Sequence, residues 1–311
     1  MKNSGKFIDF IITQKCTYKC PYCSQSKAEV KNKKNADDKT LDSFLNLLNK
    51  IDKDFEITIT GGEAMLHPKF YDLISKIKQE GFKINLITNL SFGFDEYKKV
   101  FDILGVSLNR FDISFHLDEI KDFDSAITKV RQILELKPDT TKTSFLIPLY
   151  KPDKEKERKI KIIEFVASEY NIDIDFQHIH FFENYIKNNK NTIQKKPPKT
   201  FSRLCCAGCK SAVIYENGEV YRCYSSRFLK SNYIGNINSD KFTLMSNLKP
   251  CIHNLCTCPK PEIYNQITNK KAPFRATILK LFNTIFIPYF LVKNADIVKA
   301  KLKQLKTIKN Q

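Results

Sequence analysis

Three cysteines lie within eight residues near the start of the chain, and this cluster constrains the fold and the chemistry more than any other feature. Cys16, Cys20 and Cys23 directly follow the apolar run of residues 7–12. The length and composition of that run predict a buried strand. The cysteines are therefore expected in the loop that leaves its C-terminal end. In α/β folds, ligands and catalytic loops gather at this end of the strands.

Crowded thiolates repel one another and react, so they need a disulfide, a metal ion or an iron–sulfur cluster. A single disulfide would leave one of these three thiols over. A structural zinc site is closed by a fourth protein ligand, and no second ligand pair follows nearby. Three thiolates on a [4Fe–4S] cluster leave one iron open. The spacing favours an open cluster over zinc by a modest margin.

A second motif makes a family resemblance specific. The three cysteines match the C-x3-C-x-aromatic-C signature of the radical S-adenosylmethionine (SAM) enzymes, with Tyr22 in the aromatic position. Gly61, Gly62 and Glu63 follow the strand-like run of residues 56–60 and resemble the Gly-Gly-Glu motif of the same family. Taken alone, Gly-Gly-Glu would more often be a plain strand-to-loop turn. The two motifs in order, each after a strand, favour the family.

The resemblance implies the cofactors and the reaction. A [4Fe–4S] cluster on Cys16, Cys20 and Cys23 would present its open iron to SAM, and reductive cleavage would yield a 5′-deoxyadenosyl radical that abstracts hydrogen. The electron would come from a donor such as flavodoxin or ferredoxin. The resemblance assigns no catalytic residue in addition to the cluster ligands. The residues expected to contact SAM are Tyr22, Gly61, Gly62, Glu63, Asn89 and Ser114.

Two roles in this set rest on residue type. The glycines would let the backbone approach SAM closely, and Glu63 would accept from its ammonium group. Ser114 could equally be a satisfied polar strand end. His178 and His180 are two apart and so share one face of a predicted strand. They could face substrate or serve a structural role.

The order of elements predicts an α/β fold. Residues 7–180 alternate between strand-like and helix-like segments, and six such units predict a parallel sheet with helices outside. This agrees with the partial (βα)6 TIM-like barrel that the resemblance implies. The predicted strands are residues 7–12, 56–60, 83–88, 110–116, 143–149 and 172–179. The predicted helical faces are Leu41, Phe44, Leu45 and Leu48; Phe70, Leu73, Ile74 and Ile77; Tyr97, Val100, Phe101 and Leu104; a helix over 121–136; and Ile162, Phe165 and Val166.

A second cysteine group follows a polar linker. We expect domain boundaries at 1–186, 187–200, 201–262 and 263–311, with a β-hairpin around the Asn-Gly turn at 217–218. The group resembles the SPASM/twitch extension of some radical SAM enzymes, although its second half departs from that pattern. This implies one auxiliary [4Fe–4S] cluster, with zinc as the alternative. The expected ligands are Cys206 and Cys223 with two of Cys251, Cys256 and Cys258, which leaves Cys205 and Cys209 as spares.

Composition narrows the remaining classes. The chain has 311 residues, ten cysteines and a net charge of +18. No signal peptide or membrane-spanning run is recognised, so we expect a cytoplasmic enzyme rather than a disulfide scaffold. Residues 263–311 are expected to form a basic, aromatic-rich amphipathic helical tail. Such a tail suits either an anionic membrane surface at the inner face of the membrane or packing on the barrel. No nucleic-acid motif accompanies the basic charge.

Two substrate classes fit these sequence features. Peptide modification is one class, and oxidation of a sugar- or alcohol-type small molecule is the other. A non-catalytic zinc- or nucleic-acid-binding protein is the alternative to an enzyme, and the Gly-Gly-Glu strand end argues against it.

Overall fold

The computed structural model describes residues 5–23, 34–151, 153–178, 204–205, 207–224, 232–239, 241–247 and 249–250. The chain divides into two compact units, residues 1–258 and 259–311. The second unit lies outside the described residues, and so does the expected C-terminal tail. No described helix is long and apolar enough to cross a bilayer.

The first unit is an α/β fold built on a mostly parallel sheet with the strand order β10-β9-β8-β1-β2-β3-β4-β5-β6. Strands β1 to β6 are parallel and follow chain order, as the partial (βα)6 barrel predicts. The strands of this part are β1 (Phe7–Thr13), β2 (Glu56–Gly61), β3 (Lys83–Thr88), β4 (Leu108–Ser114), β5 (Lys142–Leu149) and β6 (Asp173–His178). The helices between them are α2 (Asp38–Leu48), α3 (Phe70–Gln79), α4 (Phe94–Leu104), α5 (Phe123–Leu136) and α6 (Lys154–Glu169), with short 3-10 turns η1 (Ala64–Leu66) and η2 (Gly105–Ser107).

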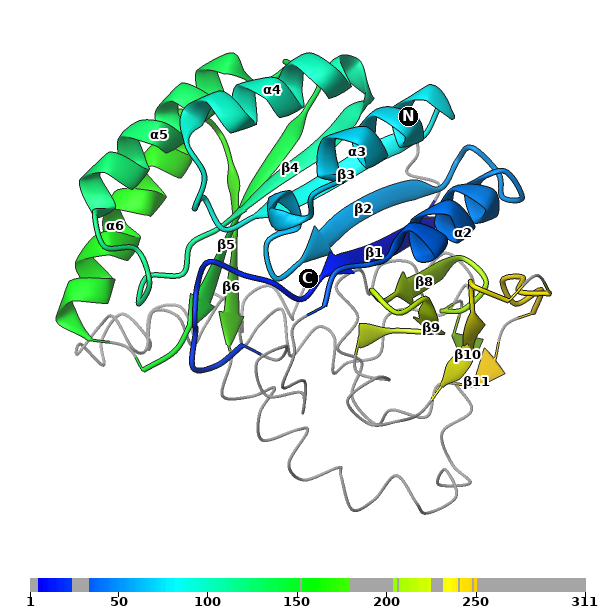
Figure 1. The fold of residues 1–311 in the computed structure, drawn as a ribbon. Coiled ribbons are helices and arrows are strands. Elements are labelled where there is room, and N and C mark those ends of the chain that lie inside the picture. The colour runs from blue at the N-terminus through cyan, green and yellow to red at the C-terminus, as the bar shows by residue number, and fades with distance from the viewer. Residues whose placement is uncertain are drawn as a thin grey trace, which may run out of the picture. The chain divides into compact units, whose positions relative to one another are not determined.

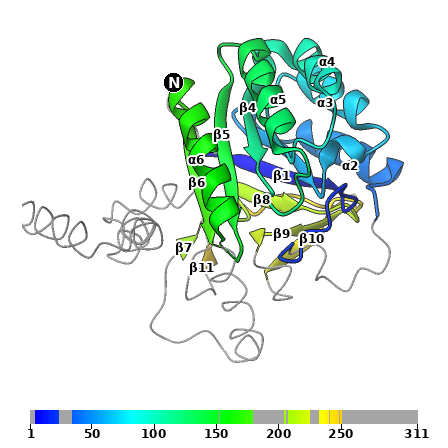
Figure 2. The same ribbon diagram turned by 90° about the vertical axis from the view of Figure 1, so that its left-hand side faces the viewer.

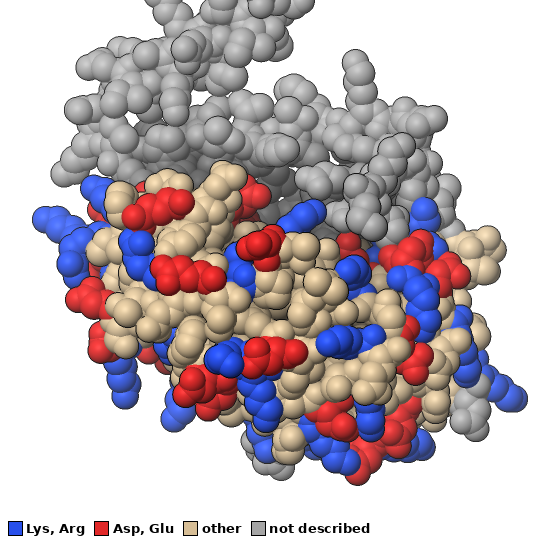
Figure 3. Space-filling model, turned by 90° about the horizontal axis from the view of Figure 1, so that it is seen from above, with Lys and Arg blue, Asp and Glu red and all other residues tan. Residues whose placement is uncertain are grey.

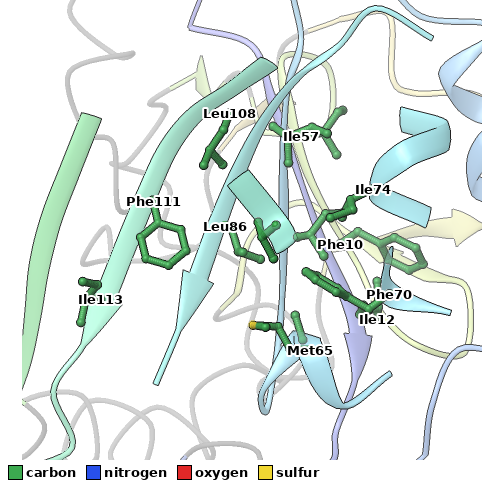
Figure 4. Close-up of a cluster of buried hydrophobic side chains, with 14 of the residues drawn as sticks. Phe10, Ile12, Ile57, Met65, Phe70, Ile74, Leu86, Leu108, Phe111 and Ile113 are labelled. Carbon is green, nitrogen blue, oxygen red and sulfur yellow. The ribbon is translucent and has the colours of Figure 1, made fainter. Parts of the chain in front are cut away.

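The helices cover one face of this sheet. Figures 1 and 2 show α2 to α6 on the same side of strands β1 to β6, and successive helices contact one another. Alternate strand residues point to that side, because Cβ atoms alternate along a strand. Phe10, Ile57 and Leu86 meet Phe70 and Ile74 of α3 in the main hydrophobic core (Figure 4).

The helical periodicity predicted most of the buried positions. The predicted faces of α3 and α4 are buried at every position, and so is the face of α2 except for Leu45, which is partly buried. Helix α2 begins at Asp38, because the Asp37 side chain caps it by accepting from Thr40 N at 2.8 Å.

The prediction for α6 was wrong at one position. Phe165 was expected on the buried face but is 59% exposed, whereas Ile160, Ile163 and Val166 are buried. The buried stripe therefore follows the spacing i, i+3, i+6 from Ile160. Phe165 lies one residue before Val166 and so is turned about 100° away from it, since an α-helix has 3.6 residues per turn.

The predicted hairpin is confirmed, and it extends the main sheet. Strands β8 (Ser211–Ile214) and β9 (Glu219–Tyr221) pair antiparallel around a turn in which Gly218 has φ +79°, a conformation that favours glycine. Strand β8 pairs in parallel with β1, and β10 (Tyr233–Asn236) follows β9. A separate two-stranded sheet joins β7 (Leu204–Cys205) and β11 (Lys249–Pro250). Residues 211–214, which follow the predicted linker in the chain, thus lie beside the strand that leads into the first cysteines.

Charge on the helix-covered side is mixed. Figure 3 shows Lys and Arg interspersed with Asp and Glu over the face seen from above in Figure 1. Exposed ion pairs also join residues one helical turn apart, such as Lys76 with Asp72 and Lys98 with Asp102. The described residues seen in this view form no broad basic patch.

Candidate functional site

The cysteine loop leaves the C-terminal end of β1, as the sequence predicted. Cys16, Cys20 and Cys23 all follow Thr13, the last residue of that strand, and all three are thiols. Cys20 is buried, and the other two are partly buried. Burial raises the pKa of the Cys20 thiol to about 12. The loop therefore lies against the protein interior.

Gly61 and Gly62 allow the cysteine loop to pack on the end of β2. The N–H of Gly62 donates to Thr13 O at 2.9 Å, and the N–H of Glu63 donates to Lys15 O at 2.8 Å. A Cβ on Gly61 would lie 2.5 Å from Thr13 O, and one on Gly62 would lie 2.9 Å from Cys16 Cβ. Real Cβ atoms do not come this close. The close approach that these glycines permit is the approach of the cysteine loop to β2.

Glu63 fastens the end of β2 to the end of β3. Its carboxylate accepts from Thr88 Oγ1 at 3.0 Å, from Asn89 N at 2.8 Å and from Met65 N at 3.4 Å. The side chain is 1% exposed, and burial raises the pKa of the carboxyl to about 7 despite these three donors. The hydrogen bonds stabilise the charged form, but the loss of water outweighs them.

Asn89 reaches the cysteine loop from the end of β3. Its side-chain Nδ2 donates to Cys16 Sγ and to Thr17 Oγ1, both at 3.3 Å. The N–H of Tyr18 also donates to Cys16 Sγ, at 3.4 Å. The two predicted motifs and the predicted polar residue of β3 therefore meet at one place in the structure.

His116 is a residue of this site that the sequence analysis did not select. Its Nδ1 lies 3.0 Å from the Tyr22 hydroxyl and 3.3 Å from Cys20 Sγ, and its Nε2 lies 3.1 Å from Ser114 Oγ. The Tyr22 ring also stacks on the imidazole, with ring centroids 6.0 Å apart. Burial lowers the pKa of His116 to about 4, so the ring is neutral. Ser114 joins the cysteine loop through this histidine.

A positional signal could have identified His116. Strand β4 ends at Ser114, two residues earlier than predicted, so His116 lies in the loop just beyond a strand end. Asn89 holds the same kind of position directly after β3. Polar residues that follow parallel strands gather at one edge of the sheet, and that rule applies to both.

The donor set fits an iron–sulfur cluster. Cysteine binds iron as the thiolate, and a thiolate accepts hydrogen bonds from N–H groups. Cys16 Sγ faces two such donors. Within the described ranges, no three His, Cys, Asp or Glu side chains converge closely enough to hold a single metal ion. A cubane binds each thiolate at a different iron, so its ligands need not converge on one point.

Most of the second predicted site lies outside the described residues. This applies to Cys206, Cys251, Cys256 and Cys258, and also to His180. Cys205 lies in β7 and His178 in β6, but their side chains are not described. Cys209 and Cys223 are partly buried thiols at the two ends of the β8–β9 region.

Comparison with known proteins identifies relatives for about half of the chain. Residues 10–166 match the profile of the Radical SAM superfamily. A tungsten-containing aldehyde ferredoxin oxidoreductase cofactor-modifying protein of Pyrococcus furiosus is 28% identical over 127 residues, which are 40% of this chain and 33% of that protein. An S-adenosylmethionine-dependent nucleotide dehydratase of Selenomonas ruminantium is 29% identical over 111 residues, 33% of this chain and 38% of that one. The chain thus spans well under half of the length of these two curated relatives.

A solved structure shares the fold. The anSMEcpe protein with bound AdoMet and the Kp18Cys peptide superimposes with a TM-score of 0.51 at 17% sequence identity. The match covers 75% of this chain and 78% of that one. The family match begins within β1 and ends within α6, so it includes every residue expected to contact SAM.

Proposed function

Because this chain belongs to the radical SAM superfamily, we propose that it cleaves SAM reductively at a [4Fe–4S] cluster held by Cys16, Cys20 and Cys23. Membership makes the chain an enzyme rather than a non-catalytic zinc- or nucleic-acid-binding protein. The observation that carries the proposal is the seating of the cysteine loop on Gly61 and Gly62, with N–H donors aimed at Cys16 Sγ.

The chain's own residues position the cofactors. When bound, the cluster and SAM supply a 5′-deoxyadenosyl radical for hydrogen abstraction, and the protein supplies orientation and exclusion of water. Glu63 uses three of the roughly four acceptor positions of a carboxylate within the protein. We propose that the ammonium group of SAM donates to the fourth, and its positive charge would favour the ionised carboxylate.

We propose a polar substrate, with a peptide as the first class and a sugar- or alcohol-type small molecule as the second. The structurally similar anSMEcpe holds a peptide, and we extend that class to this chain as a proposal. The sheet face opposite the helices carries two buried polar residues, Asp9 and Thr58, which are paired across β1 and β2. Polar groups on this face favour hydrogen bonds to a polar substrate.

The second cysteine group and the tail remain proposals of the same kind. We assign one auxiliary [4Fe–4S] cluster to Cys206, Cys223 and two of Cys251, Cys256 and Cys258, within the segment 201–262. An electron donor such as flavodoxin or ferredoxin would reduce the enzyme.

The tail would bind anionic membranes at the cytoplasmic face. Salt-sensitive co-sedimentation with anionic vesicles, lost on truncation after Lys271, tests the tail, and equal pelleting of both proteins would contradict it.

One experiment tests the main proposal. Anaerobic protein reduced with dithionite should convert SAM to 5′-deoxyadenosine and methionine. A variant with Cys16, Cys20 and Cys23 all changed to Ala should lose this activity. Cys209→Ala is the matched control, because Cys209 is a partly buried thiol outside the proposed ligand set. Cleavage by the triple variant at the wild-type rate would contradict the proposal.

A further inference from the structure

Asn89 connects both sequence motifs. Its main-chain N–H donates to Glu63 Oε2 at 2.8 Å, and its side-chain Nδ2 donates to Cys16 Sγ at 3.3 Å. The residue is 3% exposed, so water does not compete strongly for these bonds. The hydrogen bond to sulfur therefore joins the end of β3 to the first cysteine of the loop, 73 residues earlier in the chain.

The direction of the Asn89 amide is set by a second contact. The N–H of Ser91 donates to Asn89 Oδ1 at 3.0 Å. An amide has an oxygen that only accepts and a nitrogen that only donates. Since the Ser91 N–H needs the oxygen, the nitrogen must face Cys16 and Thr17. The contact with Cys16 is thus an N–H donor directed at sulfur.

The loop that carries Asn89 has a strained backbone and is held in place by hydrogen bonds. Leu90 has φ +64°, in the left-handed region that non-glycine residues rarely adopt. Lys129 of α5 donates from Nζ to Leu90 O at 2.9 Å and to Phe92 O at 2.6 Å, and Thr88 Oγ1 accepts from Leu90 N at 3.3 Å. Strain of this kind persists where the surroundings determine the conformation, and it clusters at functional sites. These hydrogen bonds keep the Asn89 side chain directed at the cysteine loop.

We propose that Asn89 is a positioning residue for the iron–sulfur cluster, which holds the Cys16 ligand in place and raises the reduction potential of the cluster. The inference rests on the proposed function, since it takes Cys16 as a cluster ligand. Hydrogen bonds to the sulfurs help to set the potentials of such clusters, and groups that contact the ligands orient them. An N–H donor withdraws electron density from the thiolate, which stabilises the added electron.

Asn89 is the donor to test because its contact with Cys16 is made between distant parts of the chain. A second N–H donor to Cys16 comes from Tyr18, within the same loop. That donor would be present in any protein with the same loop conformation, whereas the Asn89 contact requires β3 and its strained loop. Substitution of Asn89 removes one donor and leaves the Tyr18 donor in place.

Two variants of the full-length, anaerobically reconstituted protein test the proposal. Asn89→Asp keeps the size of the side chain but replaces the donor with an oxygen, and Asn89→Leu removes the donor without adding charge. Redox titrations followed by electron paramagnetic resonance measure the potential. The signal of this cluster is the difference between wild type and the triple Cys→Ala variant. Both variants should shift the potential to more negative values, with the larger shift in Asn89→Asp because of its charge.

Asn85→Leu is the matched control. Asn85 is also buried in β3 and makes two side-chain hydrogen bonds, with Glu56 and Asn109, and neither partner belongs to the cysteine loop. Its substitution should leave the potential unchanged. An unchanged potential in Asn89→Leu, an equal shift in Asn85→Leu, or Asn89 variants that fail to fold by circular dichroism while Asn85→Leu folds would each overturn the inference. A wild-type protein with no cluster beyond that of the triple variant would instead contradict the proposed function itself.

Discussion

Gly62 lies against the main chain of Lys15, and no side chain larger than hydrogen fits between them. A Cβ on Gly62 would meet the Lys15 carbonyl and would lie 2.9 Å from Cys16 Cβ. The next residue, Glu63, donates from its main-chain N–H to Lys15 O at 2.8 Å. The Gly-Gly-Glu motif and the cysteine motif are therefore one packed unit.

We expect Gly62→Ala to displace the cysteine loop. Overpacking of this kind costs about 1–3 kcal/mol, and the displaced loop should hold less iron and cleave SAM more slowly. Gly93→Ala is the control, because its Cβ would meet only the flexible Glu96 side chain. Thermal unfolding and iron analysis of both variants measure the effect. A Gly62→Ala protein with wild-type iron content and stability would show that the close packing is not needed.

Glu63 predicts a pH dependence of stability. Burial raises its folded-state pKa to about 7 from an ordinary value of 4.5, so folding favours the protonated carboxyl. This contribution is fully present below about pH 4.5 and is lost as the pH rises through about 7. It amounts to on the order of 3 kcal/mol. In the protein without SAM, the melting temperature of wild type relative to Glu63→Gln should fall between pH 5 and pH 8. A difference that is flat or rises with pH would contradict this assignment.

Substitutions of His116 should differ in how well they preserve stability and iron content. His116→Ala leaves the buried Tyr22 hydroxyl without its imidazole partner, which costs about 1–3 kcal/mol. An asparagine amide reaches the place of Nδ1, beside Tyr22 and Cys20, whereas a glutamine amide reaches the place of Nε2, beside Ser114. His116→Asn should therefore recover stability and iron content better than His116→Gln. Equal recovery by the two variants, measured by thermal unfolding and iron analysis, would count against a role at Nδ1.

The auxiliary cluster predicts residual iron. The triple Cys→Ala variant of the first loop should still bind about four irons, the content of one cubane. Adding Cys223→Ala should remove them, whereas adding Cys209→Ala should not, because Cys209 lies outside the proposed set. Iron, sulfide and zinc analysis of the three proteins decides the matter. Zinc in place of iron, or no metal in the triple variant, would show that the second site was wrongly assigned.

The sequence by itself determined the local features. The cysteine spacing, the Gly-Gly-Glu strand end and the order of six βα units could all be read from the chain, and they indicated the family and the barrel. Helical faces such as that of α3 were predictable because residues three and four apart share a face whatever lies opposite. The Asn-Gly hairpin was also predictable from local sequence, because its turn depends on two adjacent residues.

Only the tertiary structure decided which strand ends meet the cysteine loop. From the sequence we predicted that Asn89 contacts SAM, but its side-chain amide is also directed at Cys16. No sequence pattern indicated that His116 lies beside Cys20. It also could not place β8 against β1 or predict that Phe165 faces outward. These contacts join residues far apart in the chain, so they depend on strand register and on the packing of neighbouring elements, which no local pattern of residues encodes.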